Sequence, residues 1–134
     1  MTDIPQISGS SAWQMLLDDD RAVLVDVRTT TEWRTVGVPD TTDVGRPARF
    51  VSWTDENGAQ NPYFTDLATN GLDPDTPILL LCRSGARSNA AAELLIASGY
   101  SQAMNIIGGF EMPQEPGSGW KDTLPSGTYD ENNS

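Results

Sequence analysis

Apolar residues collect in short blocks along this chain, and polar or glycine-containing stretches separate the blocks. Two of them, AVLVDV at residues 22–27 and ILLLC at residues 78–82, are continuous runs of the kind found in strands that are covered on both faces. RFVSW at residues 49–53 and AMNI at residues 103–106 predict two shorter strands. The pattern therefore predicts strands distributed along most of the chain.

Helices are predicted between these strands from capping residues, apolar spacing and terminal glycines. The clearest helix covers residues 87–98, with Leu94 and Leu95 among the residues of its apolar side and Gly99 as its stop. The others run from Ser10 or Ser11 to Asp18, over the residues that precede Gly37, and over residues 62–71.

Strands and helices that alternate in this way favour an α/β domain with a central, mainly parallel sheet. The 134 residues, 37% of them hydrophobic, suit one domain with one modest core, and we expect a monomer. The domain is predicted at residues 8–122. Because the sequence after GGFE is poor in apolar residues, residues 123–134 are predicted to form a flexible acidic tail.

The charge of the chain restricts its partners. Asp and Glu number 19 against 8 Lys and Arg, which gives a formal net charge of −11. This balance argues against a broad basic face for nucleic acid or anionic membrane. The N-terminal residues MTDIPQISGSS lack the basic and apolar regions of a signal peptide, and no stretch approaches the ~20 apolar residues of a membrane span. We therefore expect a cytoplasmic protein.

The chain has one cysteine, Cys82, and no histidine. An intramolecular disulfide, an imidazole zinc site, a Ser-His-Asp triad and a Cys-His dyad are thereby excluded, and no metal or cofactor is expected. Cys82 ends a predicted strand, where ligands of parallel α/β folds collect. The alternative is that Cys82 is a small buried hydrophobic residue.

The residues after Cys82 have the composition of an anion-binding loop. Ser84, Gly85 and Ala86 are small, so their backbone N–H groups can converge on the sulfur, and the positive end of the next helix follows. Without a histidine, these amides and the guanidinium group of Arg83 or Arg87 are the route to a stabilised thiolate.

Several charged residues near the loop have two interpretations. Arg87 pairs with a carboxylate, Asp26 or Glu32, or holds the loop, and the two roles can coexist. Arg83 points outward, either to attract an anion or as a solvated side chain. Asp26 and Arg28 end a neighbouring strand on the same rim, as support for the site or as a structural ion pair.

Two serines have hydroxyl groups near the same loop. Ser84 and Ser88 can donate hydrogen bonds to a bound anion, whereas Ser88 can instead cap a turn of its own helix.

Three motifs resemble the rhodanese-type sulfurtransferases over roughly residues 8–122: VLVDVRTTTEW at 23–33, LLLCRSGARS at 79–88 and NIIGGFE at 105–111. The resemblance implies a rhodanese-like three-layer domain with a central mainly parallel sheet flanked by helices. It also implies that Cys82 forms a persulfide and that residues 83–88 bind it. GVPD at residues 37–40 departs from the more frequent family pattern, in which a histidine and a further glycine precede an apolar residue.

The resemblance implies an enzyme that moves sulfane sulfur from thiosulfate or a persulfide donor to cyanide or a thiol. Its expected partners are a small anionic donor and a thiophilic acceptor, which can be a protein. The alternative is a persulfide carrier that serves a partner protein. Phosphatase activity is disfavoured, because related phosphatases have one residue more than the four that separate Cys82 from Arg87.

Overall fold

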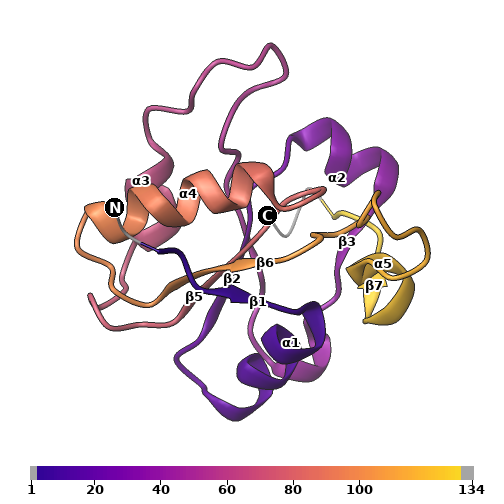
Figure 1. Ribbon diagram of the computed structural model, residues 1–134, viewed down its shortest axis with the longest axis horizontal. Coiled ribbons are helices and arrows are strands. Elements are labelled where there is room, and N and C mark those ends of the chain that lie inside the picture. The colour runs from indigo at the N-terminus through magenta and orange to yellow at the C-terminus, as the bar shows by residue number, and fades with distance from the viewer. Residues whose placement is uncertain (1–2, 131–134) are drawn as a thin grey trace.

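The computed structural model describes residues 3–130. Its main sheet has five strands in the order β1-β6-β5-β2-β4, all of whose pairings are parallel (Figure 1). These strands are β1 (Gln6–Ile7), β2 (Val23–Asp26), β4 (Arg49–Phe50), β5 (Ile78–Leu81) and β6 (Ala103–Ile106). The predicted fold class, an α/β domain with a central parallel sheet, is confirmed.

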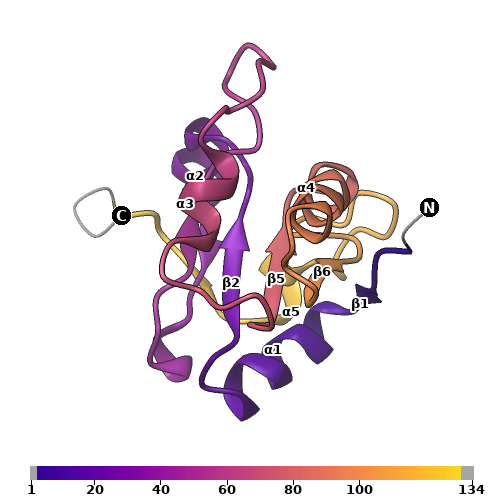
Figure 2. The ribbon, with the colours of Figure 1, turned by 90° about the vertical axis from the view of Figure 1, so that its left-hand side faces the viewer.

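The side chains of the central strands alternate between two apolar layers, as the period of a strand requires. Val25 and Leu80 face a cluster that includes buried residues of α3 (Phe64–Thr69) and α4 (Ala86–Ala97). Leu24 and Leu79 face a second cluster, which includes α1 (Gly9–Asp18) and α5 (Trp120–Thr123). Figure 1 shows α3 and α4 on one side of the strands and α1 on the other, and Figure 2 shows the sheet between α4 and α1 from the side.

The predicted helices are present, with differences at their ends. The N-cap of α1 is Ser8 rather than Ser10 or Ser11, because the Ser8 side chain accepts a hydrogen bond from the backbone N–H of Ser11. α2 (Thr30–Val36) begins at a capping box formed by Thr29 and Glu32 and ends at Gly37.

The later helices differ from prediction in extent and in the side they bury. α3 begins at Phe64, not at Pro62, and α4 begins one residue earlier than predicted and ends one residue earlier. Leu94, predicted for the apolar side of α4, is 39% exposed. The buried side consists of Ser88, Ala91, Ala92 and Leu95, so the prediction is confirmed for Leu95 and wrong for Leu94.

Short elements complete the fold. The strand predicted over residues 49–53 is reduced to the two residues of β4. β3 (Val38–Pro39) and β7 (Ser126–Gly127) form a separate antiparallel pair, and η1 (Thr42–Val44) is a single 3₁₀ turn. No helix among residues 3–130 has the length and apolar character that crossing a membrane requires.

The segment after α5 is attached to the domain, in contrast to the flexible tail predicted from residue 123. The indole N–H of the buried Trp120 donates to the Pro125 carbonyl, and β7 then pairs with β3. The ring of Tyr129 packs 5.4 Å from that of Trp33 and 5.3 Å from that of Phe50, centroid to centroid. Two aromatic anchors thus hold this stretch, and the end of the predicted tail, residues 131–134, lies outside the described residues.

Candidate active site

Cys82 is the first residue after β5, at the carboxyl edge of the sheet. Its carbonyl accepts a 2.7 Å hydrogen bond from the N–H of Phe110, which joins the strand end to the segment after β6. The residue is 1% exposed. Its Sγ accepts hydrogen bonds from the backbone N–H of Gly85 at 3.1 Å and from the hydroxyl of Ser88 at 3.2 Å. Cys82 is therefore buried, and its sulfur is in contact with two hydrogen-bond donors.

The loop depends on two glycines. Gly85 is the N-cap of α4 with φ of +106°, a conformation that an L side chain rarely adopts, and this turn directs its N–H at the sulfur. Gly109 packs on the loop from outside: a Cβ there would lie 2.3 Å from the Cys82 carbonyl oxygen and 2.6 Å from that of Arg83. The GG pair of the sequence thus permits a close approach of two backbones.

Arg87 forms a two-pronged ion pair with Glu32, with Nη1–Oε1 and Nη2–Oε2 distances of 2.7 and 2.9 Å. Of the two carboxylates suggested by the sequence, Glu32 is therefore the partner and Asp26 is not. Burial opposes ionisation of Glu32, but hydrogen bonds from Arg87 and from the Thr29 N–H outweigh it and lower the pKa of Glu32. The hydrogen bonds to Glu32 raise the pKa of Arg87.

Asp26 and Arg28 form an ion pair in which both side chains are 0% exposed. Arg28 Nη2 lies 2.7 Å from Asp26 Oδ2 and also donates to the Gly37 carbonyl at 2.8 Å. The guanidinium carbon stands 4.2 Å from the centre of the Phe110 ring. These contacts are those of a structural ion pair, one of the two interpretations, and they connect the end of β2 to the GVPD segment.

Arg83 points outward, with a side chain that is 51% exposed. Its Nε donates to Oε2 of Glu111 at 3.0 Å, so the side chain is partly paired and partly exposed to solvent. Ser84 is half-buried. Glu111 was missed as a site residue, although it stands in the GGFE motif.

Asn105 and Gln6 were also missed. The Ser88 Oγ that contacts Cys82 lies 2.5 Å from Oδ1 of Asn105, and the Asn105 Nδ2 donates to Oε1 of Gln6 at 2.8 Å. A chain of polar side chains thus runs from the buried sulfur to β1. The only sequence signal was that Asn105 belongs to NIIGGFE.

Four aromatic side chains have packing partners within the domain. Trp53 and Phe64 meet edge to face, 5.0 Å between ring centres, and Phe110 lies under Arg28. Trp33 packs between Phe50 and Tyr129.

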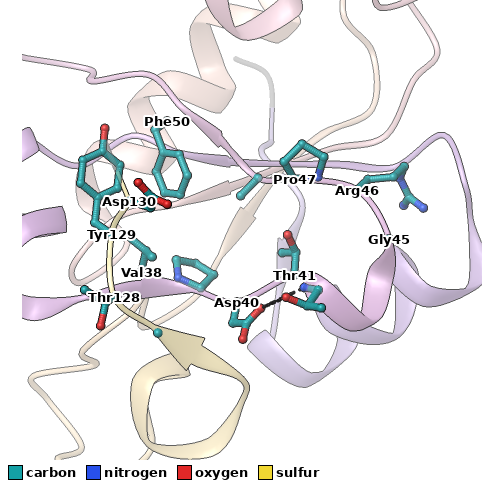
Figure 3. A pocket seen from close by; sticks show the side chains of 14 residues that line it. Val38, Asp40, Thr41, Gly45, Arg46, Pro47, Phe50, Thr128, Tyr129 and Asp130 are labelled. Atoms are coloured by element: carbon teal, nitrogen blue, oxygen red, sulfur yellow. Dashed lines mark hydrogen bonds between the residues drawn. The ribbon is translucent and has the colours of Figure 1, made fainter. Parts of the chain in front are cut away.

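A cavity of about 550 Å³ lies away from the cysteine loop, none of whose residues line it. Figure 3 shows it between the Phe50 and Tyr129 rings and the segment from Asp40 to Pro47. The cavity contains no nucleophilic thiol, because Cys82 is the one cysteine of the chain and does not line it. No group of three or more His, Cys, Asp and Glu residues within the described part of the chain is arranged to hold a metal ion.

A central parallel sheet with a cysteine loop between a strand end and a helix start defines a rhodanese-like domain. The chain belongs to the family of the STR4 middle domain, whose model matches residues 5–127. The uncharacterized protein RC0915 of Rickettsia conorii is 36% identical over 118 residues, which cover 88% of this chain and 92% of that protein. A protein of Allochromatium vinosum named sulfurtransferase is 27% identical over 106 residues, which cover 79% of this chain and 84% of that protein.

Solved structures agree with this assignment. The crystal structure of Rv0390 from M. tuberculosis superimposes with a TM-score of 0.86 at 38% identity, covering 96% of this chain and 100% of that one. Fold and relatives together support membership of a sulfurtransferase family.

Proposed function

We propose that this protein is a sulfurtransferase that carries sulfane sulfur as a persulfide of Cys82. The donor is thiosulfate or a persulfide, and the acceptor is cyanide or a thiol. The observation that supports this most directly is the environment of Sγ: it lies at a strand end and accepts hydrogen bonds from the Gly85 N–H and the Ser88 hydroxyl. Such donors stabilise negative charge on sulfur.

The two half-reactions balance without a cofactor. The Cys82 thiolate attacks the outer sulfur of thiosulfate, a new S–S bond forms, the old S–S bond breaks, and sulfite leaves with its electron pair. Cyanide then attacks the outer sulfur of the persulfide, thiocyanate leaves, and the thiolate is restored. Because Cys82 is the one cysteine of the chain, no internal thiol can take the sulfur, and transfer is intermolecular.

The role of the loop is to hold the charge that each half-reaction leaves on sulfur. The outer sulfur of the persulfide is anionic, as is the thiolate that precedes it. Donors fixed by the fold before the reaction stabilise such charges without reorganisation. Gly85 is fixed by its turn, so its N–H is preorganised, whereas the first turn of α4 holds the Ser88 oxygen near the sulfur and its proton is shared with Asn105.

Intact-mass spectrometry tests the proposal. After incubation with thiosulfate, and separately with an organic persulfide, the protein should gain about 32 Da with at least one donor. Cys82→Ser should gain nothing, and cyanide should remove the added mass from the parent. If neither donor adds mass to the parent protein, the proposed function is refuted.

Steady-state turnover separates an enzyme from a carrier. With cyanide as acceptor, an enzyme should complete many cycles per molecule. A carrier that serves a partner protein would load once and then turn over slowly without that partner.

A further inference from the structure

Three guanidinium groups surround the cysteine loop, and each of them lies against a carboxylate. The N–O distances are 2.7 to 3.0 Å for the pairs Arg28–Asp26, Arg87–Glu32 and Arg83–Glu111. The six groups add up to a formal charge of zero. The positive charge that the sequence places around Cys82 is therefore locally compensated.

Of the three pairs, Arg83–Glu111 has the most exposed guanidinium group: Arg83 is 51% and Glu111 20% exposed, against 28% for Arg87 and 20% for Glu32. The backbone holds these two residues together. The N–H of Glu111 donates to the carbonyl of Arg83 at 3.1 Å, next to the Phe110–Cys82 hydrogen bond. Gly109, which has no room for a Cβ, keeps the two segments in this close contact. The side chains therefore start from fixed positions, unlike most exposed ion pairs.

Because the charges around the cysteine loop are paired, they should affect sulfur donors of different charge differently. A single guanidinium attracts an anion over roughly a Debye length, about 8 to 10 Å, whereas a close ion pair acts as a dipole whose field falls off faster. Thiosulfate carries two negative charges. It must approach a chain of formal charge −11 and meet a negatively charged sulfur. A donor of low charge does not meet this repulsion.

We propose, building on the sulfurtransferase function above, that the Arg83–Glu111 pair selects the donor by charge. The site takes its sulfur from an organic persulfide of low charge in preference to the thiosulfate dianion. In this step the Cys82 thiolate attacks the outer sulfur of R–S–SH and the new S–S bond forms. The S–S bond of the donor breaks, and the leaving thiolate RS⁻ takes the proton of the transferred S–H to become R–SH, so that Cys82 holds an anionic persulfide.

The substitution Glu111→Gln tests the proposal by removing the charge that neutralises Arg83. With cyanide as acceptor, kcat/KM for thiosulfate should rise about fivefold, whereas kcat/KM for 2-hydroxyethyl persulfide should stay within about twofold. The matched control is Glu93→Gln, which removes the same charge from an exposed position on α4 and should change both values less than about twofold. An unchanged or lower thiosulfate value in Glu111→Gln would overturn the proposal.

The second substitution assigns the effect to Arg83. In Arg83→Gln/Glu111→Gln, the thiosulfate gain of Glu111→Gln should disappear, because the released guanidinium is no longer present. Persistence of the gain in the double variant would contradict charge selection by this pair. Circular dichroism spectra of all variants should superimpose on that of the parent.

The salt dependence of kcat/KM for thiosulfate tests the proposal on the unmodified protein. If repulsion governs the approach of thiosulfate, raising the salt concentration from 20 to 300 mM, roughly a fourfold shortening of the Debye length, should raise kcat/KM for thiosulfate. A fall with salt would indicate attraction by a free guanidinium and would overturn the proposal. A higher kcat/KM for thiosulfate than for 2-hydroxyethyl persulfide would also overturn the proposal. Failure of the sulfurtransferase function itself gives a different result, namely no added mass on Cys82 with either donor.

Discussion

The hydroxyl oxygen of Ser88 lies 3.2 Å from Sγ of Cys82, one turn into the helix that follows the cysteine loop. The same oxygen lies 2.5 Å from Oδ1 of Asn105. A hydroxyl has one proton, so it can donate to only one of these acceptors at a time. We expect the sulfur to receive this donor when it carries negative charge, and this competition leads to the first prediction.

Ser88→Ala should slow the reaction of Cys82. A hydrogen bond to a charged group contributes about 1.5 to 3 kcal/mol, but the higher intrinsic nucleophilicity of a less stabilised thiolate offsets about half of that effect. The rate of alkylation by iodoacetamide at pH 7 should therefore fall about threefold or more. Ser98→Ala, at the other end of α4, removes a hydroxyl that donates to the Leu94 carbonyl and should leave that rate unchanged. Equal rates for Ser88→Ala and the parent would show that the hydroxyl does not serve the sulfur.

The Glu32–Arg87 pair should make stability depend on pH. The folded protein holds the pKa of Glu32 below its ordinary value of 4.5, so the pair contributes fully above about pH 5.5 and its contribution is lost as the pH falls through the lowered pKa. Between pH 6 and pH 3, Glu32→Gln should therefore lose less stability in urea unfolding than the parent, by up to about 1 kcal/mol because the pair is partly exposed. Identical losses of stability in Glu32→Gln and the parent would contradict the lowered pKa of Glu32.

Gly109→Ala should destabilise the protein more than its backbone conformation alone explains. Gly109 and Gly71 both have positive φ, but a Cβ at Gly71 would have no neighbour within 4 Å, whereas one at Gly109 would collide with the Cys82 and Arg83 carbonyls. Gly71→Ala should cost about 1 kcal/mol, and Gly109→Ala at least about 2 kcal/mol more. Urea unfolding midpoints measure both, and similar losses would mean that the loop moves aside freely.

Asp26→Asn should be severely destabilising, by about 3 to 5 kcal/mol, because it leaves the Arg28 guanidinium buried without its counter-charge. Asp75→Asn provides the exposed comparison: Asp75 pairs with Arg21 at 2.6 Å, but the side chains are 72% and 48% exposed. Its loss should be below about 1 kcal/mol. Thermal unfolding of the two variants should separate them clearly, and comparable losses would contradict the structural role of the buried pair.

The sheet was predictable because its central strands carry long apolar runs. β2, β5 and β6 lie within a residue of the predicted blocks. β1, β3 and β7 have two residues each, which is too few to show any periodicity in the sequence. Ser8 was missed as a cap because three serines within four positions offer the same chemistry.

At the site, sequence reasoning found the residues that are neighbours along the chain. The small residues after Cys82 pointed to the turn that directs the Gly85 N–H at the sulfur. Glu111 and Asn105 are contributed by a segment more than 15 residues away, and only the packing of that segment on the loop assigns their partners. The sequence predicted that several backbone amides converge on the sulfur. Among the described hydrogen bonds, Sγ accepts from one amide, that of Gly85, and from one hydroxyl, that of Ser88.

The pairing of β7 with β3 matters for anyone who shortens this protein for crystallisation or fuses it to another. A version that stops at residue 122, where the composition suggests a boundary, would remove the closing strand and the ring of Tyr129, and would leave Trp33 and Phe50 facing water. Such a shortened protein should aggregate in solution. Any shortened version should therefore keep the residues up to Tyr129.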